Sequence, residues 1–219
     1  MKRLQVLIAA FAALCAGNAN AQIFSDNESY SRVELSFVSQ IHKTSASVSS
    51  ISVSAEEKPK GVAIGFIHGF KMNCPLFVET GATATFTHLK NTYEDDMEAT
   101  GNYINVAVPV NFAMKLHFSD NLTLSPFFGP NLKFNILAKE NIDGYPCVEI
   151  DYFDNEYGFE SKRFQFGLNI GIGATLSKHW YVGYKFQPDL TNFTTFDITD
   201  DVSADFKTQS HYITLGFAF

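Results

Sequence analysis

Apolar and polar residues alternate along much of this chain. Residues 163 to 176, RFQFGLNIGIGATL, carry Phe, Leu, Ile and Ala at every second position, with Gln, Asn, Gly and Thr between them. Residues 104 to 118, INVAVPVNFAMKLHF, and residues 210 to 219, SHYITLGFAF, repeat this pattern. Successive side chains of a β-strand point to opposite faces, whereas the same spacing would scatter apolar residues all round a helix. The pattern therefore predicts strands that have one apolar face.

Eight such strands are expected, at residues 30–41, 61–71, 76–89, 102–118, 121–138, 163–176, 179–188 and 208–219. Short connections at 72–75, 119–120 and 177–178 alternate with long polar ones at 42–60, 90–101, 139–162 and 189–207. Short periplasmic turns opposite long outer loops are the plan of an outer-membrane barrel. We therefore predict an all-β fold, an eight-stranded antiparallel up-and-down transmembrane β-barrel that is closed and has no free sheet edge.

A soluble eight-stranded barrel with an apolar interior is the alternative. It is disfavoured by ten glycines that all lie on the face opposite the large apolar residues: Gly61, Gly65, Gly69, Gly81, Gly129, Gly167, Gly171, Gly173, Gly183 and Gly216. The same face carries a set of charged residues: Arg32, Glu34, Lys71, Glu79, Lys115, Lys133 and Lys185. Small residues beside long charged ones suit the lumen of a narrow barrel. A soluble barrel would instead expose bands of Val, Leu, Ile and Phe to water.

The expected outward aromatic residues gather near both ends of the strands. Four come at the periplasmic edge, namely Phe70, Phe118, Trp180 and Phe219. Five come toward the outer edge, namely Phe86, Phe134, Phe164, Phe166 and Phe186. Aromatic girdles at the two membrane interfaces are typical of transmembrane barrels.

The N-terminus indicates export. Lys2 and Arg3 precede the apolar run LQVLIAAFAALCAG, and Ala19-Asn20-Ala21 follows as a small-x-small cleavage site. We expect residues 1–21 to be a removed signal peptide and residues 22–219 to be the barrel domain. Removal of Lys2 and Arg3 takes the formal charge from -7 to about -9. This acidic balance, without a basic patch, argues against nucleic acid as a partner.

The mature chain resembles a known family along nearly its whole length, from Ser31 to Phe219, and two stretches carry the resemblance. They are VAVPVNFAMKLHFSDNLTLSPFFGPNLKF and FGLNIGIGATLSKHWYVGYKF, and the terminal Phe219 adds to them. These residues resemble the outer-membrane β-barrel proteins of Bacteroidetes, the PorT-like group. The resemblance implies a barrel located in the cell outer membrane. It also implies that Phe219 is an assembly signal for the barrel-assembly machinery. It supplies no catalytic residues. The family's Gly-Leu-x-Asn step after the seventh strand is replaced here by residues 188–192, PDLTN.

The inward charged residues allow two interpretations. Arg32, Glu34, Lys71 and Glu79 are expected to lie close together, with Lys71 diagonal to Glu79 across a hairpin. A layer of ion pairs that plugs the lumen is favoured, because side chains nearly fill an eight-stranded barrel. The alternative is a narrow pore with an anion preference, since five inward basic groups face two acidic ones.

An enzyme is disfavoured. His117-Phe118-Ser119 is similar to the His-x-Ser pair of lipid A deacylases, which act at the outer leaflet. The expected register instead points His117 inward and puts Ser119 in a periplasmic turn, so no catalytic residues are assigned. The scattered histidines indicate no metal site, and no cofactor is expected.

The long loops are the expected contact surface. The third, KENIDGYPCVEIDYFDNEYGFESK, mixes acidic residues with Tyr145, Tyr152, Phe153, Tyr157 and Phe159. It is expected to be a solvated loop, partly a hairpin, whose exposed aromatics are candidates for binding an extracellular protein or glycan. Cys74 and Cys147 are expected at opposite membrane faces, which excludes a disulfide between them. We expect a monomer in outer-membrane lipid with a structural or surface-interaction role.

Overall fold

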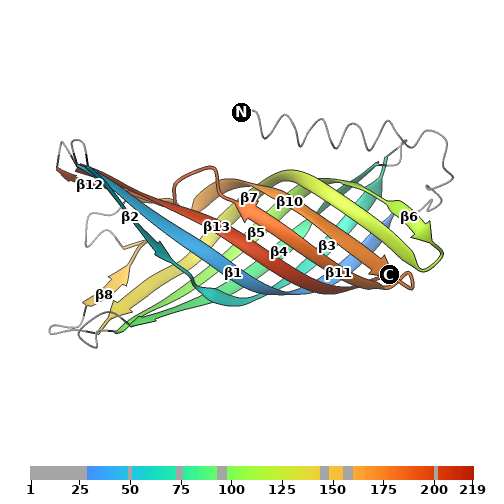
Figure 1. The fold of residues 1–219 in the computed structure, drawn as a ribbon, viewed down its shortest axis with the longest axis horizontal. Coiled ribbons are helices and arrows are strands. Elements are labelled where there is room, and N and C mark those ends of the chain that lie inside the picture. The colour runs from blue at the N-terminus through green and yellow to red at the C-terminus, as the bar shows by residue number, and fades with distance from the viewer. Residues whose placement is uncertain are drawn as a thin grey trace.

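A closed ring of eight strands forms the body of the protein (Figure 1). The computed structural model describes residues 29–48, 51–72, 76–92, 98–143, 148–154, 160–199 and 202–219. Within these ranges the ring strands are β1 (Tyr30–Val48), β3 (Lys60–Lys71), β4 (Leu76–Thr92), β5 (Glu98–Met114), β7 (Leu122–Ile142), β10 (Phe164–Leu176), β11 (Trp180–Pro188) and β13 (Val202–Ala218). They pair antiparallel in chain order, which confirms the predicted up-and-down barrel. The expected signal peptide lies outside the described residues.

No helix among the described residues is long and apolar enough to cross a membrane.

Pairing of β1 with β13 closes the ring. At its edge the backbone N–H of Ser31 donates to the carbonyl of Phe219 at 3.0 Å, and the N–H of Phe219 donates to the carbonyl of Ser31 at 2.9 Å. The stagger of the ring is found by stepping from each residue to its neighbour in register on the next strand. Starting at Arg32 on β1, the steps return to β1 at His42, ten residues farther along. They pass through Ile67, Gly81, Pro109, Asn131, Gly167, Asp189 and Thr208. This stagger tilts the strands, and eight strands leave an interior only wide enough for side chains.

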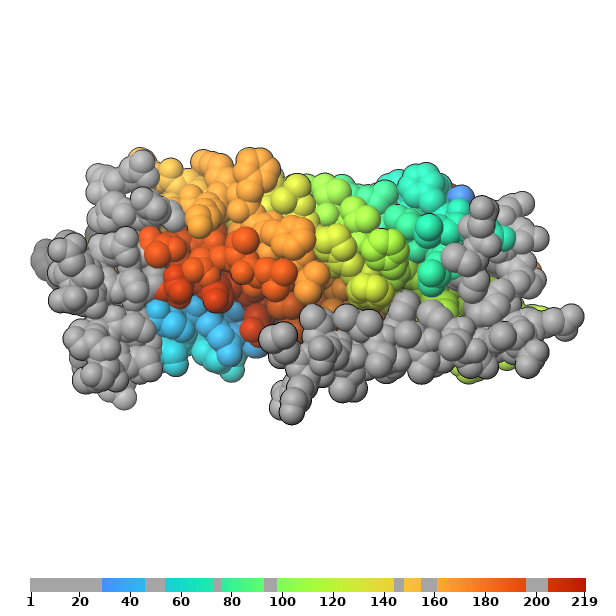
Figure 2. Space-filling view, turned by 90° about the horizontal axis from the view of Figure 1, so that it is seen from above, coloured from blue at the N-terminus to red at the C-terminus, as the bar shows by residue number. Residues whose placement is uncertain are grey.

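The outer surface is a band of exposed apolar side chains. Ile64 on β3 is 60% exposed and Leu215 on β13 is 62% exposed. In the space-filling view the coloured strands lie edge to edge as a continuous wall along the visible face (Figure 2). A wall with this much exposed hydrocarbon is stable in a bilayer and would be unstable in water.

The connections expected to be long loops are largely strands. Beyond the apolar band, β1 pairs with β2 (Ile51–Glu57), β7 pairs with β8 (Val148–Asp151), and β13 pairs with β12 (Thr194–Thr199), which also pairs with β9 (Glu160–Ser161). The alternation of apolar and polar residues is weak here because both faces of these hairpins are polar, so the sequence predicted loops instead of strands. We call this end of the barrel the hairpin end and the opposite end, with the short connections, the turn end.

At the hairpin end the described strands form two groups. One contains β2, β1, β13, β12 and β9, and the other contains β4, β5, β7 and β8. Figure 1 shows them as separate prongs at its left side. Strand β2 continues the register of β3, with only Lys58 and Pro59 between them, and the N–H of Gln40 still donates to the carbonyl of Pro59 at 2.9 Å.

Two of the predicted strands contain irregularities. The expected strand 102–118 is divided into β5 and β6 (Leu116–Ser119) at Lys115. On β7, Asn135 lies opposite Asn105 but Leu137 lies opposite Ile104, so Ile136 is an extra, bulged residue. A bulge reverses the alternation that follows it. Buried positions on β7 are therefore odd-numbered up to Asn135 and even-numbered from Ala138 onward.

Candidate functional site

The turn end of the lumen holds an ionic layer centred on Arg32. Its Nε lies 2.6 Å from Glu34 Oε1, and its Nη1 lies 3.4 Å from Glu79 Oε1. The guanidinium also sits 3.8 Å from the ring centroid of Tyr181, and the Tyr30 hydroxyl donates a hydrogen bond to Glu79. These residues come from β1, β4 and β11, so closure of the ring brings them together.

The lysines predicted to face the lumen do not all join the ionic layer. Lys115 places its Nζ 3.6 Å from the Tyr30 ring centroid, and Lys185 places its Nζ 3.9 Å from that of Tyr212. Lys71 does lie diagonal to Glu79 by register, because it pairs with Phe77. Its side chain is nevertheless exposed at the rim of the turn end, so it is not part of the buried layer.

A second buried ion pair joins Lys133 on β7 to Asp189. Their side chains are 3% and 1% exposed. Asp189 was expected to begin a long loop, but its N–H donates to the carbonyl of Thr208 at 3.0 Å and it continues the inward positions Lys185 and Gln187. Extending the alternation of β11 beyond Pro188 would have identified this residue.

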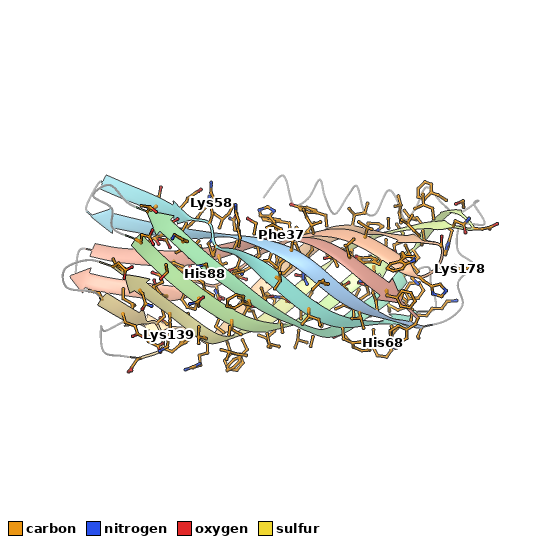
Figure 3. The ribbon with its side chains drawn as sticks, turned by 90° about the horizontal axis from the view of Figure 1, so that it is seen from below. Phe37, Lys58, His68, His88, Lys139 and Lys178 are labelled. Atoms are coloured by element: carbon orange, nitrogen blue, oxygen red, sulfur yellow. The ribbon has the colours of Figure 1, made fainter. Side chains whose placement is uncertain are left out.

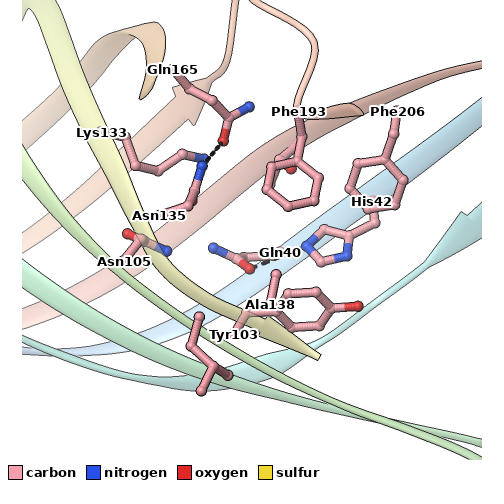
Figure 4. Close-up of a pocket in the computed structure, with 12 residues that line it drawn as sticks. Gln40, His42, Tyr103, Asn105, Lys133, Asn135, Ala138, Gln165, Phe193 and Phe206 are labelled. Carbon is pink, nitrogen blue, oxygen red and sulfur yellow. Dashed lines mark hydrogen bonds between the residues drawn. The ribbon is translucent and has the colours of Figure 1, made fainter. Parts of the chain in front are cut away.

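Buried amides and hydroxyls fill the lumen between and around the ion pairs. Asn169 Nδ2 donates to Asn111 Oδ1 at 3.0 Å, and Asn135 Nδ2 donates to Gln165 Oε1 at 2.8 Å. Thr87 donates to Gln40 Oε1 at 2.9 Å. The close-up shows Gln40, Lys133 and Gln165 converging from different strands (Figure 4).

An aromatic cap covers the lumen at the hairpin end. It consists of Leu89, Tyr103, Ala138, Tyr152, Phe193 and Phe206, with His42 beneath them. Ring centroids lie 5.6 Å apart for Tyr152 and Phe193, 5.4 Å for Phe193 and Phe206, and 4.7 Å for His42 and Tyr103. The cap joins the two strand groups, because Tyr103 and Ala138 come from one group and His42 and Phe206 from the other.

The cap corrects the expectation that the aromatics of the third loop are displayed. Tyr152 is only 8% exposed and packs in the cap, and Phe153 packs against Phe193 with ring centroids 5.8 Å apart. Tyr145, Tyr157 and Phe159, and also Cys74 and Cys147, lie outside the described residues. No sequence pattern marked Tyr152 or Phe193 as buried, because each follows or precedes a strand rather than lying within an alternating run.

Small cavities between described residues interrupt the packing of the lumen, and two of them adjoin its charged groups. One, of about 20 Å³, lies under the cap and is lined by residues that include Gln40, His42, Asn105 and Lys133. The other, also about 20 Å³, lies beside Arg32, Glu34 and Lys185. Each has room for about one water molecule, which is far less than a solute path requires.

Glycines in the lumen make room for aromatic rings more than for the lysines and arginines we expected. A Cβ at Gly173 would lie 2.2 Å from the Tyr181 ring, and a Cβ at Gly69 would lie 2.3 Å from the Tyr30 ring. Both rings lie against the Arg32 guanidinium, so the glycines leave the space in which these rings pack beside the ionic layer.

Glu140 couples the cap to pH. It lies beyond the apolar band, accepts a hydrogen bond from Tyr103 and is 8% exposed. Burial raises its pKa, hydrogen bonds from Tyr103 and Tyr152 oppose the rise, and the nearby Glu57 adds to it. A carboxyl whose folded pKa is raised contributes stability at low pH that is lost as pH rises through the raised value.

We therefore expect the contribution of Glu140 to the urea midpoint of unfolding to fall as pH rises above about 4.3, the ordinary pKa of Glu. Glu140→Gln should flatten this part of the pH profile, since the amide keeps the shape without ionising. Glu149→Gln, at an exposed site on β8, is the control and should leave the profile unchanged. An identical pH profile for Glu140→Gln and the unaltered protein would contradict the coupling.

The terminal residue and the His-x-Ser pair lie at the turn end. Phe219 has a paired backbone and a side chain that is 66% exposed. His117 Nδ1 lies 2.7 Å from Thr123 Oγ1, and Ser119 Oγ accepts from the N–H of Asn121 at 3.4 Å. Within the described ranges, no group of three His, Cys, Asp or Glu side chains is arranged to hold a metal ion.

Comparison with known proteins identifies the family. The model of the outer membrane protein beta-barrel domain matches residues 6–219. No curated protein matches this chain by sequence.

Among solved structures, the chain is similar to outer membrane protein OprG from Pseudomonas aeruginosa, with 12% identity over 90% of this chain and 99% of that chain and a TM-score of 0.47. It is also similar to outer membrane protease OmpT from Escherichia coli, with 10% identity, 91% and 99% coverage and a TM-score of 0.47. A third is Ail, the attachment invasion locus protein of Yersinia pestis, in complex with the heparin analogue sucrose octasulfate, with 12% identity, 88% and 99% coverage and a TM-score of 0.39. Because the family model spans nearly the whole chain, this protein belongs to the outer membrane protein beta-barrel domain family and is located in the outer membrane.

Proposed function

We propose that this protein is a plugged outer-membrane barrel with a structural or surface-interaction role. The observation that carries the proposal is the filled lumen. An ionic layer around Arg32, buried amides, the Lys133–Asp189 pair and the aromatic cap follow one another from the turn end to the hairpin end. Moving a solute through would require breaking each of these layers in turn.

The hairpin end is the proposed contact surface. The strands that form it are long, with 19 residues in β1 and 21 in β7, whereas about 9–11 residues cross a membrane. By the general plan of such barrels this end faces outward, and the termini face the periplasm. We propose that it binds an extracellular protein or glycan. A photo-crosslinker at Ser54 or Glu149, both exposed, should give a discrete adduct in cells, and its absence at both sites would count against the role.

The remaining expectations belong to the same proposal. Residues 1–21 are proposed to be a removed signal peptide, Phe219 a recognition signal for the barrel-assembly machinery, and the mature protein a monomer without cofactor or catalytic function. The narrower assignment to the PorT-like barrels of Bacteroidetes rests on the motifs of β5, β7, β10 and β11. If His117 and Ser119 are not catalytic, replacing both with alanine should leave the lipid A of the cell unchanged by mass spectrometry.

A small anion-selective pore is the second candidate. Its support is weaker than the sequence indicated, because Lys71 is exposed and Asp189 adds a buried carboxylate. The described part of the lumen that crosses the membrane then holds four basic and three acidic side chains. They are Arg32, Lys115, Lys133 and Lys185 against Glu34, Glu79 and Asp189. The positive excess is one charge instead of the three expected.

Single-channel recording in planar bilayers separates the two functions. The unaltered protein should show no steady, resolvable openings. A cap variant, Tyr152→Ala/Phe193→Ala, should also stay closed, because the charged and amide layers below the cap are intact. Steady openings of the unaltered protein would establish the pore, whereas openings of the cap variant alone would place the barrier in the cap. Migration of unboiled against boiled samples on a gel verifies that each protein is folded.

A further inference from the structure

One side of the barrel has a sharp boundary between apolar and polar residues on its outer surface. Six outward residues on adjacent strands lie directly side by side in one row, which we call the polar row: His211, Ser39, Lys60, His88, Asn102 and Lys139. The next outward row toward the turn end is entirely apolar: Ile213, Phe37, Val62, Phe86, Ile104 and Leu137. The change within one row marks the level at which the wall leaves the hydrocarbon.

The polar row is confined to this side. The corresponding edge over β7 and β10 carries aromatic side chains, with the Phe134 and Phe164 rings 4.9 Å apart between centroids. Figure 3 shows Lys58, His88 and Lys139 along the hairpin-end part of the visible face, with Phe37 nearer the middle of the barrel. Headgroups of one leaflet therefore meet basic and hydrogen-bonding groups on one side and aromatic rings on the other.

Three lysines near the polar row have an acidic partner. Lys43 pairs with Glu56 at 2.9 Å, Lys90 with Glu98 at 3.0 Å, and Lys139 with Asp151 at 3.2 Å. Lys60, like the nearby Lys58, differs, since no carboxylate of the described residues lies within salt-bridge distance of its ammonium group. An unneutralised lysine at this level is notable in a chain whose net charge is -7.

The neighbours of Lys60 are arranged to share an anion. His88 lies directly opposite Lys60 on β4, and both side chains are exposed. His88 Nδ1 lies 3.0 Å from Asn102 Oδ1, an acceptor, so Nδ1 donates; Nε2 can then donate to an anion when the imidazole is protonated. The imidazolium form of His88 would repel the Lys60 ammonium group directly opposite, and an anion bound between the two converts this repulsion into attraction.

We propose that Lys60 and His88, flanked by Ser39 and Asn102, bind a phosphate group of an anionic, phosphorylated glycolipid in the leaflet at the hairpin end. The lipid's acyl chains lie against the apolar row that contains Phe37, Val62 and Phe86, which are 51%, 54% and 44% exposed. Phosphate oxygens accept hydrogen bonds from ammonium, imidazole, hydroxyl and amide groups, all of which this row supplies. The inference rests on the barrel spanning the membrane and on the outward orientation of the hairpin end proposed above.

Native mass spectrometry of the detergent-solubilised barrel tests the proposal by titration with diphosphorylated lipid A. Lys60→Gln/His88→Gln is expected to weaken binding by about tenfold or more, because charge-assisted hydrogen bonds to phosphate are lost. Lipid A stripped of its phosphates should bind the unaltered protein as weakly as the variant binds the intact lipid. Lys178→Gln/His179→Gln removes the same two residue types at the exposed turn end and should bind like the unaltered protein.

The outcomes separate specific binding from its alternatives. Equal weakening in both double variants would show unspecific charge attraction, and equal binding of the dephosphorylated lipid would show contact through acyl chains alone. Displacement of the lipid by dilute inorganic phosphate would assign the site to the free anion. Each of these results would overturn the proposal. If the Lys60→Gln/His88→Gln variant does not fold, Lys60→Gln alone is tested and should still weaken binding severalfold.

Discussion

Lys133→Met is expected to lower the free energy of unfolding by about 3–5 kcal/mol, the largest single effect predicted for a lumen charge. The substitution keeps the length of the side chain but leaves Asp189, which is 1% exposed, without its counter-charge. A carboxylate in that position must either lose its solvation without compensation or take up a proton. The loss of stability should also affect the aromatic cap, because Asp189 begins the segment that places Phe193 in the cap.

The double variant Lys133→Met/Asp189→Asn tests this reason. Removing both charges should restore at least half of the lost stability, since a buried pair as a whole contributes little compared with the cost of breaking it. Urea unfolding followed by the fluorescence of Trp180, the single tryptophan, measures both variants. Lys139→Met, which breaks an exposed pair, is the control and should cost about 1 kcal/mol or less. A double variant as unstable as Lys133→Met would show that the lysine matters for packing instead of charge.

Gly81→Ala is expected to destabilise the barrel by about 3 kcal/mol or more, or to prevent folding. A Cβ at Gly81 on β4 would lie 1.9 Å from the carbonyl oxygen of Phe66 on β3. That oxygen belongs to the backbone of the paired strand, so relief requires the two strands to move apart. Glycine in a strand often marks such a close approach of another backbone.

Gly65→Ala is the matched control, because it lies on the partner strand and faces the same lumen. A Cβ there would lie 3.0 Å from the hydroxyl oxygen of Thr83, which can rotate away. Its cost should be about 1 kcal/mol, close to the general penalty of a tight side-chain contact. The folded fraction, from gel migration of unboiled samples, and the urea midpoint compare the two. Similar values for both variants would contradict the backbone-contact explanation.

The predictions made from sequence succeeded where the bilayer imposes one rule on every strand. Each ring strand must present apolar residues to lipid at alternate positions, so the eight strands, and their inward faces wherever the strands are regular, could be predicted from local sequence. The hairpins beyond the apolar band were not predicted from the sequence, because neither of their faces meets lipid. Residues 42–48 and 51–57 pair as a hairpin although their alternation is weak.

The candidate site was readable in part. Arg32, Glu34 and Glu79 were expected together and meet in one layer, but Lys71 at the same register is exposed. The burial of Glu140 depends on the bulge at Ile136, which reverses the faces of β7 and which no residue type announces. Tyr152 and Phe193 enter the cap from irregular segments, where periodicity carries no information.

The sequence by itself determined that the chain forms a lipid-facing wall and, over the regular part of each ring strand, which residues face its lumen, because alternation is a local property that lipid enforces. Only the tertiary structure decided which lumen side chains meet. Asp189 reaches Lys133, and Tyr152 reaches Phe193 and Phe206, through the stagger and closure of the ring. Those contacts join residues far apart in the chain, and their partners are selected by register, bulges and strand tilt instead of by any local pattern.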